Sequence, residues 1–234
     1  MSAKKETIIL WLIIGFGFVL RVWNINAGLP FIPQADEPIT VNRALRFGSG
    51  DFNPHFFYYP SAQMYLSFIL YGVYFVFGLI SGLFHSVNDF ALAFIKNPTP
   101  FYILGRATTL IPGVLMIWWI YLLGTKLRSS GIGIIAAGIC AFIPTLIQPT
   151  HYVKGDIPMV SLLVLAYLFI YSAYNTGQVK YYILSGLTLG IATGFKYTAG
   201  LAGSGIIALI LIQAFQKKKI PDLIKGLGLL FCFW

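Results

Sequence analysis

The chain has 234 residues, of which 58% are hydrophobic and only 10% are charged, whereas a soluble domain usually has about 25% charged residues. Its mean hydropathy is +0.79, so a single core cannot hide its apolar surface and lipid must cover part of it. The net charge of +9 comes from basic residues in short clusters between apolar runs, a pattern of membrane topology and not of nucleic-acid binding.

Uncharged runs along the chain predict membrane helices, because a helix needs roughly 20 residues to cross the hydrocarbon core. The first run ends at Arg21 and Trp23 like an interfacial anchor, so we expect an uncleaved helix and not a secretory signal. The predicted fold class is an all-α membrane protein, a polytopic transmembrane helix bundle. The runs are Thr7–Leu20, Phe52–Asn88, Ala107–Thr125, Ser129–Val153, Ile157–Val179, Tyr181–Phe195 and Tyr197–Gln216.

The run Phe52–Asn88 decides the topology. If it does not cross the membrane and the N-terminus lies inside, nine basic residues are inside and seven outside; if it crosses, six are inside and ten outside. The excess of inside positive charge favours the first arrangement. We therefore expect residues 24–105 to form one long outer loop with interfacial helices. A last apolar run, 226–234, stops short of a span, so we expect a single domain, 1–234, that is the N-terminal fragment of a longer protein.

The pair Asp36-Glu37 lies in this outer loop, just after the first helix. Two adjacent carboxylates at a membrane surface repel each other and are costly without a role or a cation. One is a candidate general base, and the other a candidate for orienting it or contacting substrate. The alternative is structural: Asp36 as the N-cap of a helix with Pro38 in its first turn.

A second polar cluster, from His151 through Lys154 to Asp156, fills a short loop between two apolar runs. Together these three side chains are able to bind an anionic headgroup, although Asp156 alone also fits a helix cap. Arg106 and Lys196 are cations on the same predicted face. Each is a candidate contact for a lipid phosphate, or a side chain that snorkels to the interface.

The segment Gly50–Pro60 is rich in aromatic residues and turn formers, and includes His55, Tyr58 and Tyr59. It is suited to stacking on a sugar and contacting a polyprenyl chain, or to forming an aromatic belt at headgroup level. The sequence has no Walker A loop, HExxH motif or CxxC pair, which argues against an ATPase, a zinc protease and a redox enzyme. We expect neither a cofactor nor a metal.

In their order, these residues resemble the polytopic glycosyltransferases of the protein O-mannosyltransferase and aminoarabinose transferase type, which have the C-type glycosyltransferase fold. The resemblance covers nearly the whole chain, and Asp36-Glu37 is its most specific part. Supporting positions are Arg21, Gly28-Leu29-Pro30, Gly50 to His55, Tyr59-Pro60, Arg106, Pro144, His151 to Pro158 and Gly190 to Lys196.

The resemblance implies a reaction. A sugar leaves a polyprenyl-phosphate carrier by inversion in a single displacement, with Asp36 as base at the acceptor and Glu37 beside it. Asp156 matches a further acid of the family, and Arg106 and Lys196 match basic residues that hold the phosphate. Some members carry a lysine just before the proline at position 60, where this chain has Tyr59. The implied acceptor is a protein, lipid or glycan on the outer face of the plasma or cytoplasmic membrane.

Two other functions are compatible with a polytopic chain. A transporter or flippase-like permease places charges within its spans and often has paired repeats, whereas the acids here cluster in predicted outer loops and no repeat is visible. A non-catalytic membrane scaffold predicts that an Asp36→Asn change affects nothing but stability.

Overall fold

A computed structural model describes residues 3–217, 228 and 232, so nearly all of the predicted last run, 226–234, lies outside it. The described part of the chain contains helices and no strand. The helices are α1 (Ala3–Val22), α2 (Asp36–Arg46), η1 (Phe47–Ser49), α3 (Ala62–Ser81), α4 (Val87–Lys96), α5 (Thr99–Leu127), α6 (Ser130–Phe142), α7 (Pro144–Ile147), η2 (Gln148–His151), α8 (Asp156–Thr176), α9 (Val179–Phe195) and α10 (Ala199–Lys217).

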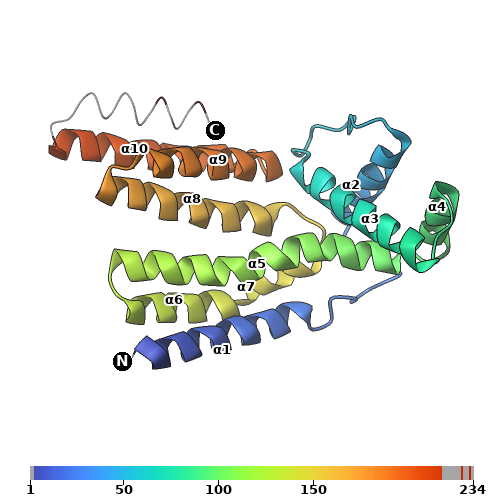
Figure 1. The fold of residues 1–234 in the computed structure, drawn as a ribbon, viewed down its shortest axis with the longest axis horizontal. Helices are drawn as coiled ribbons and strands as arrows, with labels where there is room; N and C mark the ends of the chain where they lie inside the picture. Colours follow the sequence, from blue (N-terminus) through green and yellow to red (C-terminus); the bar gives the residue numbers. More distant parts are fainter. Residues whose placement is uncertain (1–2, 218–227, 229–231, 233–234) are drawn as a thin grey trace.

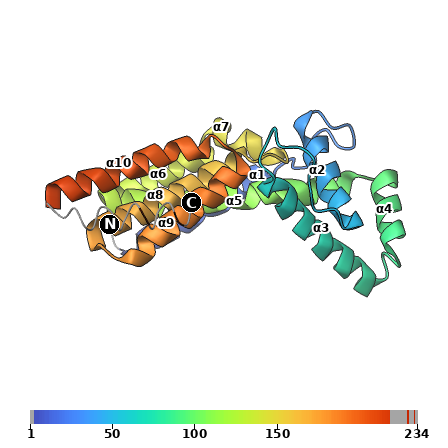
Figure 2. The same cartoon turned by 90° about the horizontal axis from the view of Figure 1, so that it is seen from above.

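The helices form a bundle and a smaller group at one end of it (Figure 1). Helices α1, α5, α6, α8, α9 and α10 run side by side, while α2, α3 and α4 lie beyond the right-hand end in both views (Figures 1 and 2). At 1.5 Å per residue, the 29 residues of α5 reach about 43 Å, which lets its first turns extend out of the bundle to support α2 and α3. Short turns at 128–129 and 196–198 join α5 to α6 and α9 to α10.

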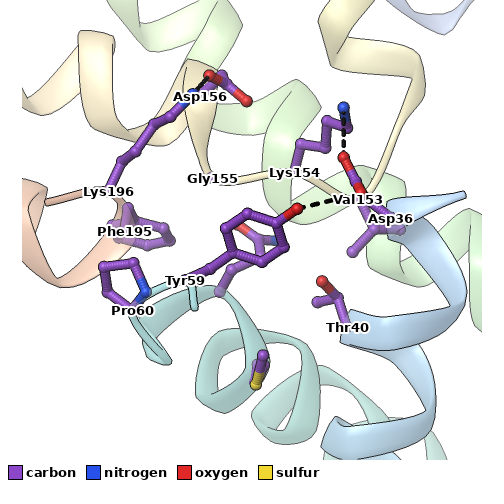
Figure 3. A pocket seen from close by; sticks show the side chains of 12 residues that line it. Asp36, Thr40, Tyr59, Pro60, Val153, Lys154, Gly155, Asp156, Phe195 and Lys196 are labelled. Atoms are coloured by element: carbon purple, nitrogen blue, oxygen red, sulfur yellow. Dashed lines mark hydrogen bonds and ion pairs between the residues drawn. The ribbon is translucent and has the colours of Figure 1, made fainter. Parts of the chain in front are cut away.

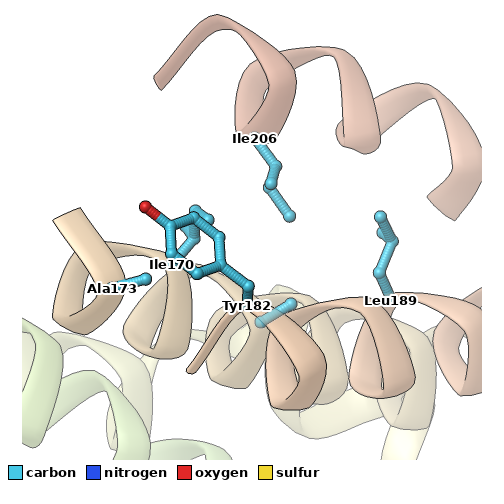
Figure 4. Close-up of a cluster of buried hydrophobic side chains, with 6 residues drawn as sticks. Ile170, Ala173, Tyr182, Leu189 and Ile206 are labelled. Carbon is cyan, nitrogen blue, oxygen red and sulfur yellow. The ribbon is translucent and has the colours of Figure 1, made fainter. Parts of the chain in front are cut away.

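The bundle is held together by apolar contacts between neighbouring helices. Figure 4 shows one such cluster, in which Ile170 and Ala173 of α8 meet Tyr182 and Leu189 of α9 and Ile206 of α10. Helices α5 and α6 approach so closely at Gly124 that an added Cβ would lie 2.9 Å from the Cα of a facing glycine. Small residues permit such close helix packing in membranes.

The predicted run Ser129–Val153 does not form one continuous helix. It bends by 71° between Ser130–Phe142 and Pro144–His151, because Pro144 has no N–H to donate to the carbonyl of Cys140. The guanidinium of Arg21 replaces the missing donors, with Nη2 3.1 Å from the Cys140 oxygen and Nη1 3.1 Å from the Ala141 oxygen. Arg21 is fully buried and bonds inside the bundle, so of the predicted anchor pair Arg21 and Trp23 only Trp23 is exposed.

Three described helices, α3, α5 and α8, are long and apolar enough to cross a membrane, and the bent pair α6 with α7–η2 would add a fourth. The chain is thus an all-α integral membrane protein, as predicted. Helices α1, α9 and α10 lie alongside these spans but are not among the helices whose length and composition together suit a crossing.

Helix α3 is the segment whose crossing the sequence left open. Its length and apolarity alone would allow a span, but it lies beyond the end of the bundle, at an angle to it (Figure 2). One face packs on α2 and α5, and the opposite face exposes a stripe of apolar side chains. The position and the stripe favour an interfacial helix. The stripe consists of Ile69, Val73, Phe77 and Ile80.

Candidate active site

Asp36 is the first residue of α2, and its carboxylate points to the loop before α8. No side-chain cap closes this helix; its N-cap residue is Ala35, so the structural alternative for Asp36 does not hold. Oδ2 of Asp36 lies 2.7 Å from Nζ of Lys154, and the hydroxyl of Tyr59 donates to Oδ1 at 3.2 Å. The hydrogen bond from Lys154 is the main reason that the pKa of Asp36 is lowered below its usual value.

A second carboxylate–ammonium pair lies next to the first. Asp156 opens α8, again without a side-chain cap, and its Oδ1 pairs with Nζ of Lys196 in the loop after α9. The two segments meet at Gly155, where an added Cβ would lie 2.5 Å from the carbonyl oxygen of Phe195. A glycine at position 155 is therefore what lets the two loops approach and bring Asp156 to Lys196.

Glu37 was predicted to act beside Asp36 and Arg106 to hold the phosphate, but in the structure the two side chains face each other inside the protein and do not line the pocket. Both side chains are 0% exposed and form a bidentate pair, with Nε–Oε1 2.9 Å and Nη2–Oε2 2.8 Å. The N–H of Val153 donates to the same carboxylate at 2.9 Å, and Nη1 of Arg106 donates to the carbonyls of Ile25 and Ala27. The pair therefore links α2 to α5, to the loop after α1 and to the loop before α8. These links position the neighbouring Asp36.

The two exposed ion pairs face one pocket of about 220 Å³ (Figure 3). In the close-up, Asp36 and Lys154 lie on one side of Tyr59, and Asp156 and Lys196 lie near Phe195 on the other. Acidic residues distant in sequence therefore share one end of the bundle, as the non-crossing topology required. The lining residues are Asp36, Thr40, Tyr59, Pro60, Gln63, Met64, Val153, Lys154, Gly155, Asp156, Phe195 and Lys196.

Three predicted substrate-binding residues do not line this pocket. His55 is paired with Asp51 at 2.8 Å, Tyr58 is 79% exposed with its ring 5.1 Å from that of Tyr59, and the Nε2 of His151 lies 3.0 Å from the carbonyl oxygen of Trp23. The structure thus keeps only Tyr59 of the predicted aromatic set at the pocket wall.

The sequence interpretation missed Thr40 and Gln63, which also line the pocket. Thr40 follows Asp36 by four residues on the same helix, so the spacing of i and i+4 was a usable signal. Gln63 was a polar residue at the start of an apolar run, which was also visible in the sequence. Among the described residues no group of three or more His, Cys, Asp or Glu side chains is arranged to hold a metal ion.

Comparison with known proteins identifies the family of the chain. The sequence model of dolichyl-phosphate-mannose-protein mannosyltransferases matches residues 103–234, which is more than half of the chain. The chain belongs to this family. The match includes the loop from His151 to Asp156 and Lys196, whereas Asp36 lies before it. No curated protein matches the sequence significantly.

The structure of this family member is also similar to that of an oligosaccharyltransferase from Archaeoglobus fulgidus, solved in its apo form. The TM-score is 0.70 at 18% sequence identity, and the match covers 99% of this chain and 29% of that one. At this identity the likeness shows a shared fold, and the predicted C-type glycosyltransferase-like bundle is confirmed. The chain spans less than a third of the length of that oligosaccharyltransferase.

Proposed function

We propose that this chain carries the catalytic pocket of a membrane glycosyltransferase that moves a sugar from a polyprenyl-phosphate carrier to a hydroxyl acceptor. The observation that carries the proposal is that Asp36 and Asp156, each paired with a lysine, line the same pocket. A carboxylate is able to accept a proton, and an ammonium group stabilises the negative charge of a leaving phosphate. Mannose is the first sugar to test and protein the first acceptor, because the name of the family specifies both.

The reaction that fits these groups is one displacement at the anomeric carbon. The acceptor oxygen forms a bond to that carbon while the bond from the carbon to the phosphate oxygen breaks, which inverts the configuration. The proton of the acceptor hydroxyl passes to the carboxylate of Asp36. The electron pair of the broken bond stays on the polyprenyl phosphate, whose negative charge Lys154 and Lys196 neutralise.

The ion pair with Lys154 keeps Asp36 in the charge state that this reaction needs. Because Lys154 lowers the pKa of Asp36, the carboxylate is ionised and able to accept a proton at neutral pH. The side chains of Asp36 and Lys154 are about one-third and one-quarter exposed, respectively. A phosphate entering the pocket is therefore able to draw Lys154 away from Asp36 without opening the core.

The positions of the acids favour an enzyme over a permease. Asp36 and Asp156 lie at the starts of helices at one end of the bundle, whereas transport sites typically lie near the bilayer midplane between paired repeats. We infer that this end faces the outer side of the membrane, where the acceptor and the sugar-bearing headgroup meet.

The test is sugar transfer by the purified, complete protein from radiolabelled polyprenyl-phosphate mannose to an acceptor polypeptide. Replacing the base, Asp36→Asn, should lower the rate by roughly 100- to 10,000-fold while the protein stays folded. Asp51→Asn is the matched control, because Asp51 is exposed and paired with His55 away from the pocket; it should transfer at the normal rate. Unchanged transfer by Asp36→Asn would remove Asp36 from the mechanism.

A further inference from the structure

Gln63 has an unused hydrogen-bond acceptor at the wall of the pocket. The residue lies in the first turn of α3, is 4% exposed and lines the pocket. Its Nε2 donates to the hydroxyl oxygen of Thr108 on α5, but its Oε1 has no partner among the described residues. A buried acceptor left unpaired is costly, so a ligand that supplies a donor here gains more than a surface contact would give.

The neighbouring groups fix which end of the amide is free. The hydroxyl of Thr108 donates its only proton to the carbonyl of Gly105, so toward Gln63 it can act only as an acceptor. The NH₂ end of Gln63 must therefore face Thr108. The carbonyl end is left over, and a flip of the amide would set two acceptors against each other.

Two other buried groups on this face of α3 also lack partners within the described part of the chain: the hydroxyls of Ser67 and Tyr71, one and two turns further along. Neither lines the pocket. Of these three residues, only Gln63 belongs to the pocket lining. Ser67 therefore provides a control for the general effect of an unpaired polar group on α3.

The chemistry of the substrates indicates which group donates a hydrogen bond to Oε1 of Gln63. An ionised phosphate offers only acceptors, and a polyprenyl chain offers no hydrogen-bonding group. The acceptor hydroxyl gives its proton to Asp36 in the proposed reaction. A polypeptide acceptor also offers N–H donors, which the donor analogues below distinguish from the sugar hydroxyls. We propose that Oε1 of Gln63 accepts a hydrogen bond from a hydroxyl of the transferred sugar and is a specificity-determining residue of the pocket. This inference rests on the glycosyltransferase function proposed above.

The experiment measures how protein variants transfer sugar from chemically altered polyprenyl-phosphate mannose substrates. The probes are polyprenyl-phosphate mannose and a set of analogues in which one mannose hydroxyl at a time is replaced by hydrogen. For one analogue, wild-type protein is expected to lose about 5- to 150-fold in kcat/KM, because the acceptor stays unpaired. Gln63→Met is similar in size but has no acceptor, so it should treat that analogue and the parent donor alike. Ser67→Ala should discriminate as wild type does.

Each result decides the proposal. If Gln63→Met still rejects every analogue as wild type does, Gln63 makes no such contact, while the transfer function stands. If no donor is transferred even by wild-type protein, the proposed function fails and this inference falls with it. Gln63→Glu keeps an acceptor oxygen and should retain a preference for the parent donor. If Gln63→Met does not fold, loss of that preference in folded Gln63→Glu overturns the proposal.

Discussion

Replacing Arg106 by methionine should destabilise the fold, because this side chain is a buried structural link and not a direct phosphate contact. The change leaves the fully buried carboxylate of Glu37 with a single partner, the N–H of Val153 at 2.9 Å. It also removes the donor to the carbonyls of Ile25 and Ala27. The damage therefore extends to α2, α5 and the loop after α1.

The size of the effect follows from the burial of the pair. Removing one partner of a buried ion pair costs about 3–5 kcal/mol, because the remaining charge is uncompensated. In a protein of 150–250 residues, 1 kcal/mol shifts the midpoint of thermal unfolding by about 2–4 °C. Arg106→Met should therefore lower the midpoint by roughly 6–20 °C. A double variant with Glu37→Met should recover part of that loss, because no charge is then left unpaired.

The protein contains a reporter for this unfolding. Cys140 is buried among α1, α5 and α6, so its thiol reacts with a fluorogenic reagent only when the bundle opens. Cys232 is exposed and is first replaced by serine. Arg46→Met is the control, because Arg46 is an exposed cation 3.6 Å from Asp51; such surface pairs contribute about 0–1 kcal/mol.

Two results would refute this reasoning. One is an unfolding midpoint for Arg106→Met as high as that of Arg46→Met. The other is a raised KM for the polyprenyl-phosphate donor with an unchanged midpoint, which would show that Arg106 contacts the phosphate directly, as the family resemblance implied.

Three further predictions follow from the structure. Arg21→Met removes the donors at the break after α6 and should cost roughly 1–3 kcal/mol for each carbonyl left unpaired, measured as a lower unfolding midpoint; an unchanged midpoint contradicts it. Lys154→Met removes the main cause of the lowered pKa of Asp36. Because the pKa of the base then rises, the acid limb of the pH–rate profile should move to higher pH. An acid limb at the same pH as in the wild-type protein would contradict the pairing of Asp36 with Lys154. Gly155→Ala pushes a methyl group toward the backbone of Phe195 and should cost about 1–3 kcal/mol and slow transfer; normal rate and stability would show that the close approach is dispensable.

The sequence was most informative where one property decides the outcome. Hydropathy predicted the helix bundle, since lipid leaves few alternatives to helices. The count of basic residues on each side predicted that Asp36 and Asp156 lie at the same end, because only a non-crossing Phe52–Asn88 segment allows it. Scarcity of acids singled out both residues, and the structure brings them to one pocket.

The sequence did not reveal which side chains far apart along the chain would pair with each other. Glu37 and Arg106 are 69 residues apart, and no local pattern shows that they neutralise each other, so Glu37 was predicted to act beside Asp36 and Arg106 to hold the phosphate. The same limit applies to Arg21, which reaches carbonyls about 120 positions away. The break that frees those carbonyls was signalled by Pro144, but a proline alone does not predict which side chain replaces the missing donor.

Proposed transfer to an outer acceptor requires that the pocket open to the outer side of the membrane. The most direct test is labelling of single cysteines in intact cells with a membrane-impermeant thiol reagent, after removal of Cys140 and Cys232. Tyr58→Cys and Tyr197→Cys report on exposed positions near the pocket, and Arg128→Cys reports on the opposite end, where α5 turns into α6. We expect labelling at positions 58 and 197 but not at 128. Labelling at 128 alone would place the pocket on the inner face and contradict transfer to an outer acceptor.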